Sequence, residues 1–265
     1  MASLSDTMAG MNKIEELAEG STAVHKLHPM VKLIATVIYI VVVISFSRYN
    51  VSGLIPFVFY PVVLMALAEI PYSLVFKRVA MVLPFCIFAG ISNIIFDKAM
   101  VFTVGGFGIT AGMVSFTSIL LKTFLTVTAV LILIATTQIP ELTYQLRILK
   151  VPEILVVQLT MTYRYISVLL EETTTMYTAY ILRSPLHRGI QMKDMGVFVG
   201  QLLLRSFDRA ERVYYAMKCR GFEGGIGYTS YKMPSVASIC ILLAVIAVML
   251  VLRFINLSLI LGRWI

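Results

Sequence analysis

The sequence predicts an all-α polytopic membrane protein with about five transmembrane helices and a cytoplasmic domain of long amphipathic helices. Of its 265 residues, 59% are hydrophobic and only 14% are charged, whereas a soluble domain is about 45–50% apolar and about 25% charged. The apolar residues are concentrated in a few long stretches, and the basic residues in one segment of a different pattern. This composition excludes an ordinary cytosolic enzyme, a disordered protein and a small disulfide scaffold.

Five apolar stretches are long enough to cross a bilayer, which takes about 20 mostly apolar residues. Prolines inside two of them do not exclude a helix, because neighbouring groups in a membrane protein satisfy the freed carbonyls. The predicted transmembrane helices are residues 30–47, 51–68, 79–96, 112–137 and 235–261.

Residues 138–234 differ from the rest of the chain, because polar residues recur every few positions among the apolar ones. This segment holds 12 of the 22 Lys and Arg residues, and basic loops tend to stay in the cytoplasm. Placing it inside leaves only Arg48, Lys98 and Arg263 outside. We therefore expect a cytoplasmic N-terminal segment (1–29), four transmembrane helices (30–137), a cytoplasmic helical domain (138–234) and a last transmembrane helix (235–265).

The sequence contains no recognisable catalytic or metal-binding pattern. It has no GxxxxGK[ST], HExxH or GxSxG motif. The glycines within residues 105–108 are typical of a tight extracytoplasmic turn. His25 and His28 precede Pro29 and are expected at the membrane edge, since a metal site needs more ligands nearby. We expect no metal site, no catalytic residue, no cofactor in this chain and no nucleic-acid partner.

Two ionisable residues, Lys122 and Arg253, lie within predicted spans. Such residues are costly in a bilayer and often functional. Lys122 could equally snorkel to the interface or hydrogen-bond a neighbouring helix. Without an Asp or Glu inside a span, the chain shows no proton relay and no cation path.

Two long helices are predicted within residues 138–234. The first begins after Pro152, because proline suits the first turn of a helix. It ends at Arg183, because Pro185 disfavours helix at the residue before it. The second begins near Asp194 and ends before Gly221, which is a natural left-handed cap.

Both predicted helices end in an arginine followed by a helix breaker, in Leu182-Arg183-Ser184-Pro185 and Cys219-Arg220-Gly221-Phe222. A cation in the last turn complements the helix dipole, which is worth about 0.3–1 kcal/mol. A guanidinium also presents a planar fork suited to carboxylates, so each end could insert into an acidic groove on a soluble partner. Three further arginines of the second helix are interpreted mainly as a solvated face: Arg205, Arg209 and Arg212.

Short motifs recur in a characteristic order between residues 27 and 222. They are Leu27-His28-Pro29-Met30-Val31-Lys32-Leu33, Ile139-Pro140-Glu141-Leu142, Leu149-Lys150-Val151-Pro152, Tyr163-Arg164-Tyr165-Ile166 and Ala216-Met217-Lys218-Cys219-Arg220-Gly221-Phe222. In order and spacing the chain resembles the transmembrane T component of energy-coupling factor (ECF) transporters, most closely the cobalt-type CbiQ family.

The resemblance implies roles for particular residues. In this family, two Ala-Arg-Gly-like motifs cap coupling helices that dock into two ATP-binding cassette ATPase subunits. Here the docking residues would be Arg183 with Ser184 and Arg220 with Gly221. Residues expected to support the coupling helices are Leu182, Cys219, Arg164 and Met217, the first two of which replace the usual alanine.

The resemblance also implies a function for the whole chain. It would be a non-catalytic subunit of an ATP-driven importer for cobalt or nickel ions in a prokaryotic cell membrane. Partner ATPases would bind ATP and Mg²⁺, and a separate membrane subunit, CbiM/CbiN-like or another S component, would bind the substrate. The T component joins the two and transmits the movement between them.

Three alternatives remain open at this point. A T component of a vitamin ECF importer would look much the same. A self-sufficient channel or secondary carrier, with Lys122 or Arg253 gating, would transport without ATP or partners. A membrane enzyme would turn over a substrate by itself, although the sequence shows no catalytic set.

Overall fold

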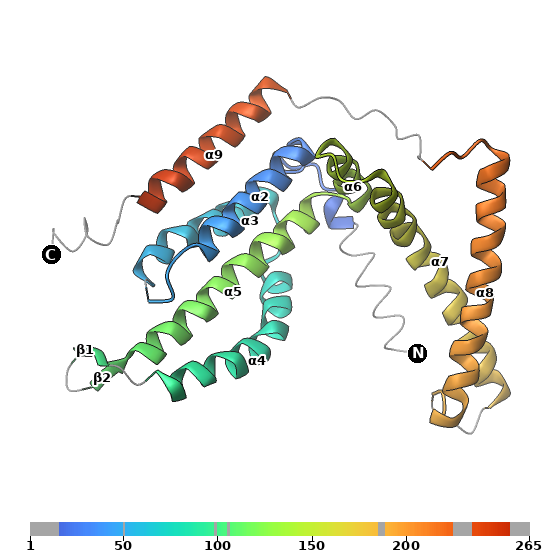
Figure 1. Ribbon diagram of the computed structural model, residues 1–265, viewed down its shortest axis with the longest axis horizontal. Helices are drawn as coiled ribbons and strands as arrows, with labels where there is room; N and C mark the ends of the chain where they lie inside the picture. Colours follow the sequence, from blue (N-terminus) through green and yellow to red (C-terminus); the bar gives the residue numbers. More distant parts are fainter. Residues whose placement is uncertain are drawn as a thin grey trace. The chain divides into compact units, whose positions relative to one another are not determined.

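The computed structural model describes residues 16–49, 51–97, 100–104, 107–184, 189–224 and 235–254, and most of them are helical (Figure 1). The all-α class is confirmed, with a short hairpin added. In chain order the elements are α2 (Pro29–Ile44), the 3₁₀-helix η1 (Ser52–Val58), α3 (Phe59–Ala68), α4 (Tyr72–Phe96), β1 (Met100–Val104), β2 (Phe107–Thr110), α5 (Ala111–Thr136), α6 (Ile139–Ile148), α7 (Glu153–Arg183), α8 (Met192–Cys219) and α9 (Val236–Phe254).

The chain divides into two compact units. We call the first the bundle unit; it comprises residues 16–138 and 232–265 and contains α2 to α5 and α9. We call the second the α6–α8 unit; it comprises residues 1–15 and 139–231. The boundary after residue 138 falls between α5 and α6, so these two helices connect the units directly along the chain.

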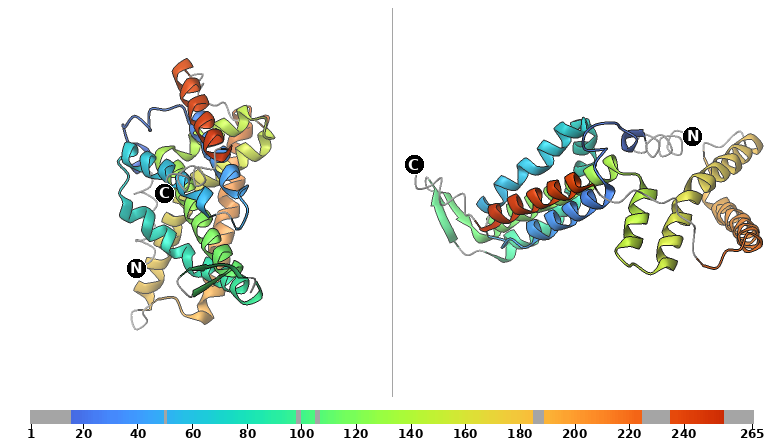
Figure 2. Two further views of the ribbon diagram at one scale, coloured as in Figure 1. Left: turned by 90° about the vertical axis from the view of Figure 1, so that its left-hand side faces the viewer. Right: turned by 90° about the horizontal axis from the view of Figure 1, so that it is seen from above.

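The core of the bundle unit surrounds α2. Tyr39 is fully buried, its hydroxyl donates to the Phe57 carbonyl at 2.9 Å, and its ring stacks on Tyr60 with 4.5 Å between centroids. α9 lies beside α2 (Figure 2). A second cluster includes Met65 and Ile132 and lies where α3 and α5 end. Satisfying the buried tyrosine hydroxyl matters, because an unpaired polar group in an apolar core is costly.

Four helices of the described residues are long and apolar enough to cross a bilayer: Tyr72–Ile94, Ala111–Thr136, Glu153–Arg183 and Val236–Arg253. Two shorter apolar helices are Pro29–Ile44 and Ser52–Ala68. The prediction for residues 51–68 is corrected in one respect, because this stretch is a 3₁₀-helix followed by an α-helix. Pro56 lies within the 3₁₀-helix, where it cannot donate a backbone hydrogen bond.

The predicted span 79–96 begins too late. α4 starts at Tyr72, directly after its N-cap Pro71. The sequence-based boundary stopped at the basic pair Lys77-Arg78, but the helix continues through it. The Lys77 side chain is exposed, and a long cationic side chain can keep its head in water while its stem covers apolar surface.

α7 is long and apolar enough for a membrane span, although it lies in the segment that the sequence predicts to be cytoplasmic. It is the least apolar of the four candidates. It also carries five charged residues: Glu153, Arg164, Glu171, Glu172 and Arg183. Charges of this number are expensive inside a bilayer, and two of them form ion pairs described below.

A hairpin connects α4 to α5. β1 and β2 are antiparallel, with Val104 opposite Phe107. The two residues between these partners, Gly105 and Gly106, belong to the predicted tight turn and lie outside the described residues.

In the α6–α8 unit, α6 packs on α7 across a short turn. Lys150 in this turn has a positive φ of 61°, and Arg147 pairs with Glu153 at 3.0 Å. α7 and α8 run antiparallel and lie apart toward the start of α7 and the end of α8 (Figure 1). Neither helix is well covered, since α8 has no buried residue and α7 buries only Val156.

Candidate functional site

The first candidate site is the C-terminal end of α7. The helix ends at Arg183, which confirms the predicted end. The Ser184 N–H closes the last turn by donating to the carbonyls of Tyr180 and Ile181, at 3.0 and 3.1 Å. Leu182 is 77% exposed and Arg183 is exposed as well. Among the described residues, no carboxylate forms an ion pair with Arg183.

The second candidate site is the C-terminal end of α8. Gly221 has a φ of 79°, which confirms the predicted left-handed cap. The Phe222 N–H donates to the Met217 carbonyl at 3.1 Å, and the Gly221 N–H to the Lys218 carbonyl at 3.0 Å. This pair of hydrogen bonds is a Schellman motif. Arg220 is exposed beside it, on a backbone that the motif holds in one conformation.

Replacing Gly221 by alanine is expected to destabilise this end of α8 by about 1–2 kcal/mol, because a side chain strains a left-handed backbone. Crowding will not contribute, since a Cβ at this position has no heavy atom within 4 Å. Hydrogen exchange at Phe222 measures the effect. Gly221→Asn is the control, because asparagine tolerates this conformation; equal exchange rates for Gly221→Ala and the unchanged chain would contradict the prediction.

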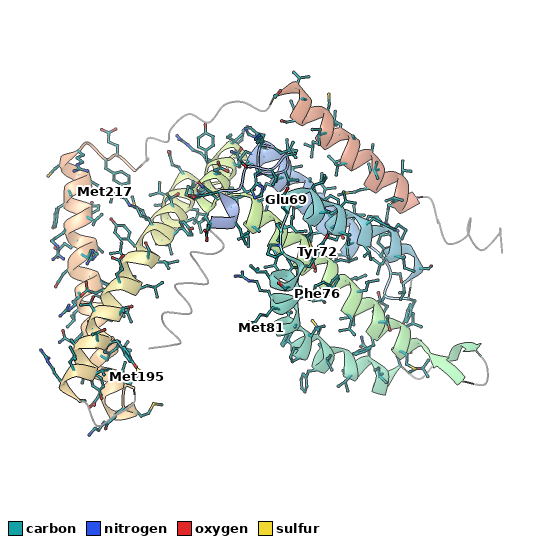
Figure 3. All side chains as sticks on the ribbon, turned by 180° about the vertical axis from the view of Figure 1, so that it is seen from behind. Glu69, Tyr72, Phe76, Met81, Met195 and Met217 are labelled. Atoms are coloured by element: carbon teal, nitrogen blue, oxygen red, sulfur yellow. The ribbon has the colours of Figure 1, made fainter. Side chains whose placement is uncertain are left out.

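The two arginine ends lie far apart. Arg183 stands near the start of α8, because Tyr180 one turn earlier contacts Asp194, and Arg220 follows the end of α8. The 28 residues of α8 span about 42 Å at about 1.5 Å per residue. Met195 and Met217, close to its two ends, mark this separation in Figure 3. One small groove on a partner could not take both arginines, whereas two partner subunits could.

The Arg183 end is fixed by a tie between α7 and α8. The Tyr180 hydroxyl donates to the Asp194 carboxylate at 2.7 Å and accepts from the Gln191 N–H at 3.3 Å. Asp194 also lies in the first turn of α8, where a carboxylate favours the positive end of the helix dipole. The tie therefore sets the direction in which α7 presents its last turn.

Tyr180→Phe is expected to loosen this end without unfolding the helices, because it removes both hydrogen bonds and keeps the ring. Amide exchange at Gln191 should accelerate, and binding of a partner at Arg183 should weaken less than when Arg183 itself is replaced. Tyr215→Phe is a matched control, since Tyr215 lies on α8 with 57% exposure. If both variants exchange alike at Gln191, the tie does not position this end.

Two of the three arginines interpreted as a solvated face have side chains that are 56% and 39% exposed, and both also form ion pairs. Arg205 and Arg209 bind the two carboxylate oxygens of Glu172, at 2.5 and 3.2 Å. They lie four residues apart and so share one face of α8. That spacing was visible in the sequence, but the partner on α7 was not. Arg212 is exposed.

A cavity of about 300 Å³ opens between α7 and α8. Its walls are mainly apolar and include Tyr165, Leu169, Val213 and Met217, with Arg209 as a charged member. Met217 therefore has two contacts. Its side chain lines this cavity, which we call the α7–α8 groove, and its carbonyl accepts the Phe222 N–H in the Schellman motif beside Arg220. The other predicted support residues are placed differently: Arg164 and Cys219 are exposed and neither lines the groove.

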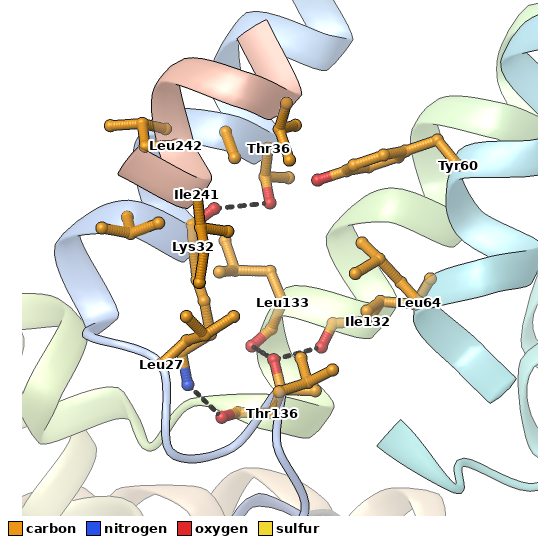
Figure 4. Close-up of a pocket in the computed structure, with 14 residues that line it drawn as sticks. Leu27, Lys32, Thr36, Tyr60, Leu64, Ile132, Leu133, Thr136, Ile241 and Leu242 are labelled. Carbon is orange, nitrogen blue, oxygen red and sulfur yellow. Dashed lines mark hydrogen bonds between the residues drawn. The ribbon is translucent and has the colours of Figure 1, made fainter. Parts of the chain in front are cut away.

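The sequence does not reveal a cluster of contacts at the end of α5, of which Figure 4 shows the hydrogen bond between Lys32 and Thr136. Lys32, only 8% exposed, donates from Nζ to the carbonyls of Thr136 and His25, at 2.6 and 3.3 Å. The His25 ring contacts the Leu17 carbonyl at 2.9 Å and the Ala135 carbonyl at 3.4 Å. Ala135 and Thr136 are the last two residues of α5, so the cluster holds the end of α5 that leads into the α6–α8 unit.

The His28 ring has a separate role at the start of α2. Its Nδ1 accepts from the Met30 N–H at 3.2 Å and so caps the first turn of the helix. Both histidines of the 25–28 stretch are therefore engaged with backbone groups of the bundle unit.

The chain matches the family model CbiQ, described as cobalt transport protein, over residues 20–236. It is 28% identical over 240 residues to the energy-coupling factor transporter transmembrane protein EcfT of Bacillus subtilis, covering 83% of this chain and 88% of that protein. The corresponding protein of Streptococcus equi is 25% identical over 236 residues, covering 82% and 85%. An uncharacterized protein of Methanocaldococcus jannaschii is 28% identical over 243 residues, covering 86% and 81%.

Proposed function

Since this chain belongs to the CbiQ family, we propose that it is the transmembrane coupling (T) subunit of an ATP-driven ECF-type importer. It binds two cytoplasmic ATP-binding cassette ATPases and a membrane subunit that carries the substrate site. The chain itself is non-catalytic; ATP and Mg²⁺ are bound by the ATPases. Two exposed arginines at well-separated, backbone-fixed helix ends are the observation that carries this proposal, because they offer one docking point for each ATPase.

The mechanism follows from the placement of the two ends. Arg183 and Arg220 each enter an acidic groove, one on each ATPase. When ATP binding closes the ATPase pair, the two grooves move relative to each other and turn α8, which has one docking arginine near each of its ends. α7 and α8 bury few residues and are separated by a cavity. The angle between the two helices can therefore change with little loss of packing. That change displaces the substrate-binding subunit in the membrane.

We place the chain in the prokaryotic cell membrane with its N-terminus and residues 138–234 in the cytoplasm. The distribution of basic residues supports this orientation. The charges of α7 and their ion pairs with α8 support a location of this helix outside the bilayer, despite its length. Partners that hydrolyse ATP are cytoplasmic, so the arginine ends must face that side.

The substrate is proposed to be Co²⁺ or Ni²⁺. The description of the family names cobalt, whereas the two relatives from Bacillus and Streptococcus are named only for the ECF transporter as a whole. The substrate-binding subunit is a different chain, so its identity decides between a metal importer and a vitamin importer.

The test is affinity purification of this chain from its native membrane, followed by identification of the bound subunits and reconstitution in vesicles. Two ATPase chains and one membrane subunit are expected, and uptake should require ATP. A metal-binding membrane subunit supports cobalt or nickel, and a vitamin-binding subunit replaces that assignment. Transport by the purified chain alone, without ATP, would overturn the proposal in favour of a self-sufficient carrier.

A further inference from the structure

Two cations meet at the C-terminal end of α2. The Lys122 ammonium of α5 donates to the carbonyls of Phe46 and Ile44, at 2.5 and 3.3 Å. The Arg253 guanidinium of α9 donates to the carbonyl and the hydroxyl of Ser45, at 3.2 and 3.4 Å. Three consecutive carbonyls therefore bring together charges from two other helices. Of the alternatives for Lys122, hydrogen bonding to a neighbouring helix is observed.

The bundle unit has almost no negative charge with which to neutralise this pair. Its sequence contains four carboxylates: Glu16, Glu19, Glu69 and Asp97. The first two precede α2. Glu69 is the C-cap of α3, and its neighbour Ala68 packs with Val24 and Ala135 in the second core cluster. These three lie toward the opposite end of α2 from Lys122.

The fourth carboxylate is already engaged. Asp97 accepts a hydrogen bond from the Tyr49 hydroxyl at 2.9 Å. This bond raises the pKa of Tyr49 above its ordinary value, so the hydroxyl keeps its proton and remains the donor to Asp97. Neither Lys122 nor Arg253 forms an ion pair with a carboxylate of the described residues.

The two cations keep donors beyond those that the carbonyls use. A guanidinium has five N–H groups and an ammonium three, and the two hydrogen bonds from Arg253 to Ser45 use only Nη2. The guanidinium also lies over the Phe46 ring, 4.2 Å from its centroid, which holds its plane in place. A convergent, oriented pair of cations is the arrangement that binds a tetrahedral oxyanion.

The site also lies within reach of the headgroup region. α2 has 16 residues and is about 24 Å long, less than the hydrocarbon thickness of about 30 Å. Long cationic side chains at the end of such a helix extend toward the interface, where the phosphate groups of the lipids lie.

We propose that Lys122 and Arg253, held on the last carbonyls of α2, bind the phosphate group of an anionic phospholipid. The site is independent of the docking arginines and of the substrate that the assembly carries. The same phosphate chemistry would also accept free inorganic phosphate, and the experiment separates the two sources.

The experiment uses the full-length chain in detergent. Its thermal stability and its lipid retention in native mass spectrometry are measured with phosphatidylglycerol, with phosphatidylcholine of the same acyl chains, and with inorganic phosphate. A ligand that binds only the folded state raises the unfolding temperature. We expect phosphatidylglycerol to bind the unchanged chain at least tenfold more tightly than phosphatidylcholine. The absence of that preference overturns the proposal without any variant.

The decisive variant is Lys122→Gln with Arg253→Gln, because glutamine still offers N–H donors to the α2 carbonyls but carries no charge. It should lose the preference, whereas Lys122→Arg with Arg253→Lys should keep it. Lys77→Gln with Arg78→Gln removes two charges from α4 and is the matched control. An unchanged preference in the Lys122→Gln, Arg253→Gln chain overturns the site. Full stabilisation by inorganic phosphate at the same concentration overturns the lipid assignment.

Discussion

Replacing Arg183 and Arg220 together by alanine is expected to abolish co-purification of the ATPases and ATP-driven uptake. Both side chains are exposed at capped helix ends, so the chain itself should fold and reach the membrane as before. Truncating one member of a charge pair that is desolvated in an interface costs about 2–5 kcal/mol. Each single replacement should therefore weaken its own ATPase contact roughly 30-fold or more.

The single variants carry separate information, because the two ends are separated by the length of α8. Arg183→Ala should release one ATPase and leave the contact at Arg220, and the reverse should hold for Arg220→Ala. Subunit stoichiometry measured by native mass spectrometry distinguishes these states. The control is Lys193→Ala with Lys218→Ala, which removes two exposed cations near the same two ends. If the chain lacking both arginines binds and transports normally, the docking model is wrong.

Lys32→Met is expected to lower the unfolding temperature and to impair coupling. Hydrogen bonds to a charged group contribute about 1.5–3 kcal/mol each, and Lys32 makes two of them to the carbonyls of Thr136 and His25. Methionine fills a similar volume but donates nothing. The last turn of α5 then loses its hydrogen bond to the Lys32 side chain of α2. A movement of the α6–α8 unit is therefore transmitted less well to the bundle unit.

Two measurements test this prediction. Thermal unfolding in detergent reports the lost hydrogen bonds, and uptake per ATP hydrolysed in the reconstituted assembly reports coupling. ATPase binding should persist, because the arginine ends are unchanged. Lys26→Met is the control, since Lys26 is exposed near the same end of α2. Equal unfolding temperatures and equal uptake for the two variants would falsify the proposed role of Lys32.

The ends of α7 and α8 could be predicted from the sequence because local residues determine them. Pro185 forbids the continuation of α7, and Gly221 takes a backbone conformation that few other residues adopt. The start of α4 could not be located from the sequence, because the basic pair at residues 77–78 interrupts the apolar pattern but not the helix. Periodicity alone also gave no sign that residues 52–58 would form a 3₁₀-helix.

Contacts between distant segments could not be predicted in the same way. Lys32 and Thr136 are 104 residues apart in sequence, and Glu172 meets Arg205 and Arg209 only once α7 and α8 pair. A single sequence identifies such residues as charged or polar but does not identify their partners. The sequence therefore shows Lys32 only as a basic residue within a family motif, and Arg205 and Arg209 only as members of a solvated face.

The sparse burial of α7 and α8 has a consequence for how much of this protein a cell can maintain. Large apolar side chains on α8, among them Leu203, Leu204 and Phe207, are more than half exposed. Apolar surface left uncovered invites aggregation, and chaperones and proteases act on such species. Copies made in excess of their partners should therefore be degraded, so that the supply of the other subunits sets the abundance of this one.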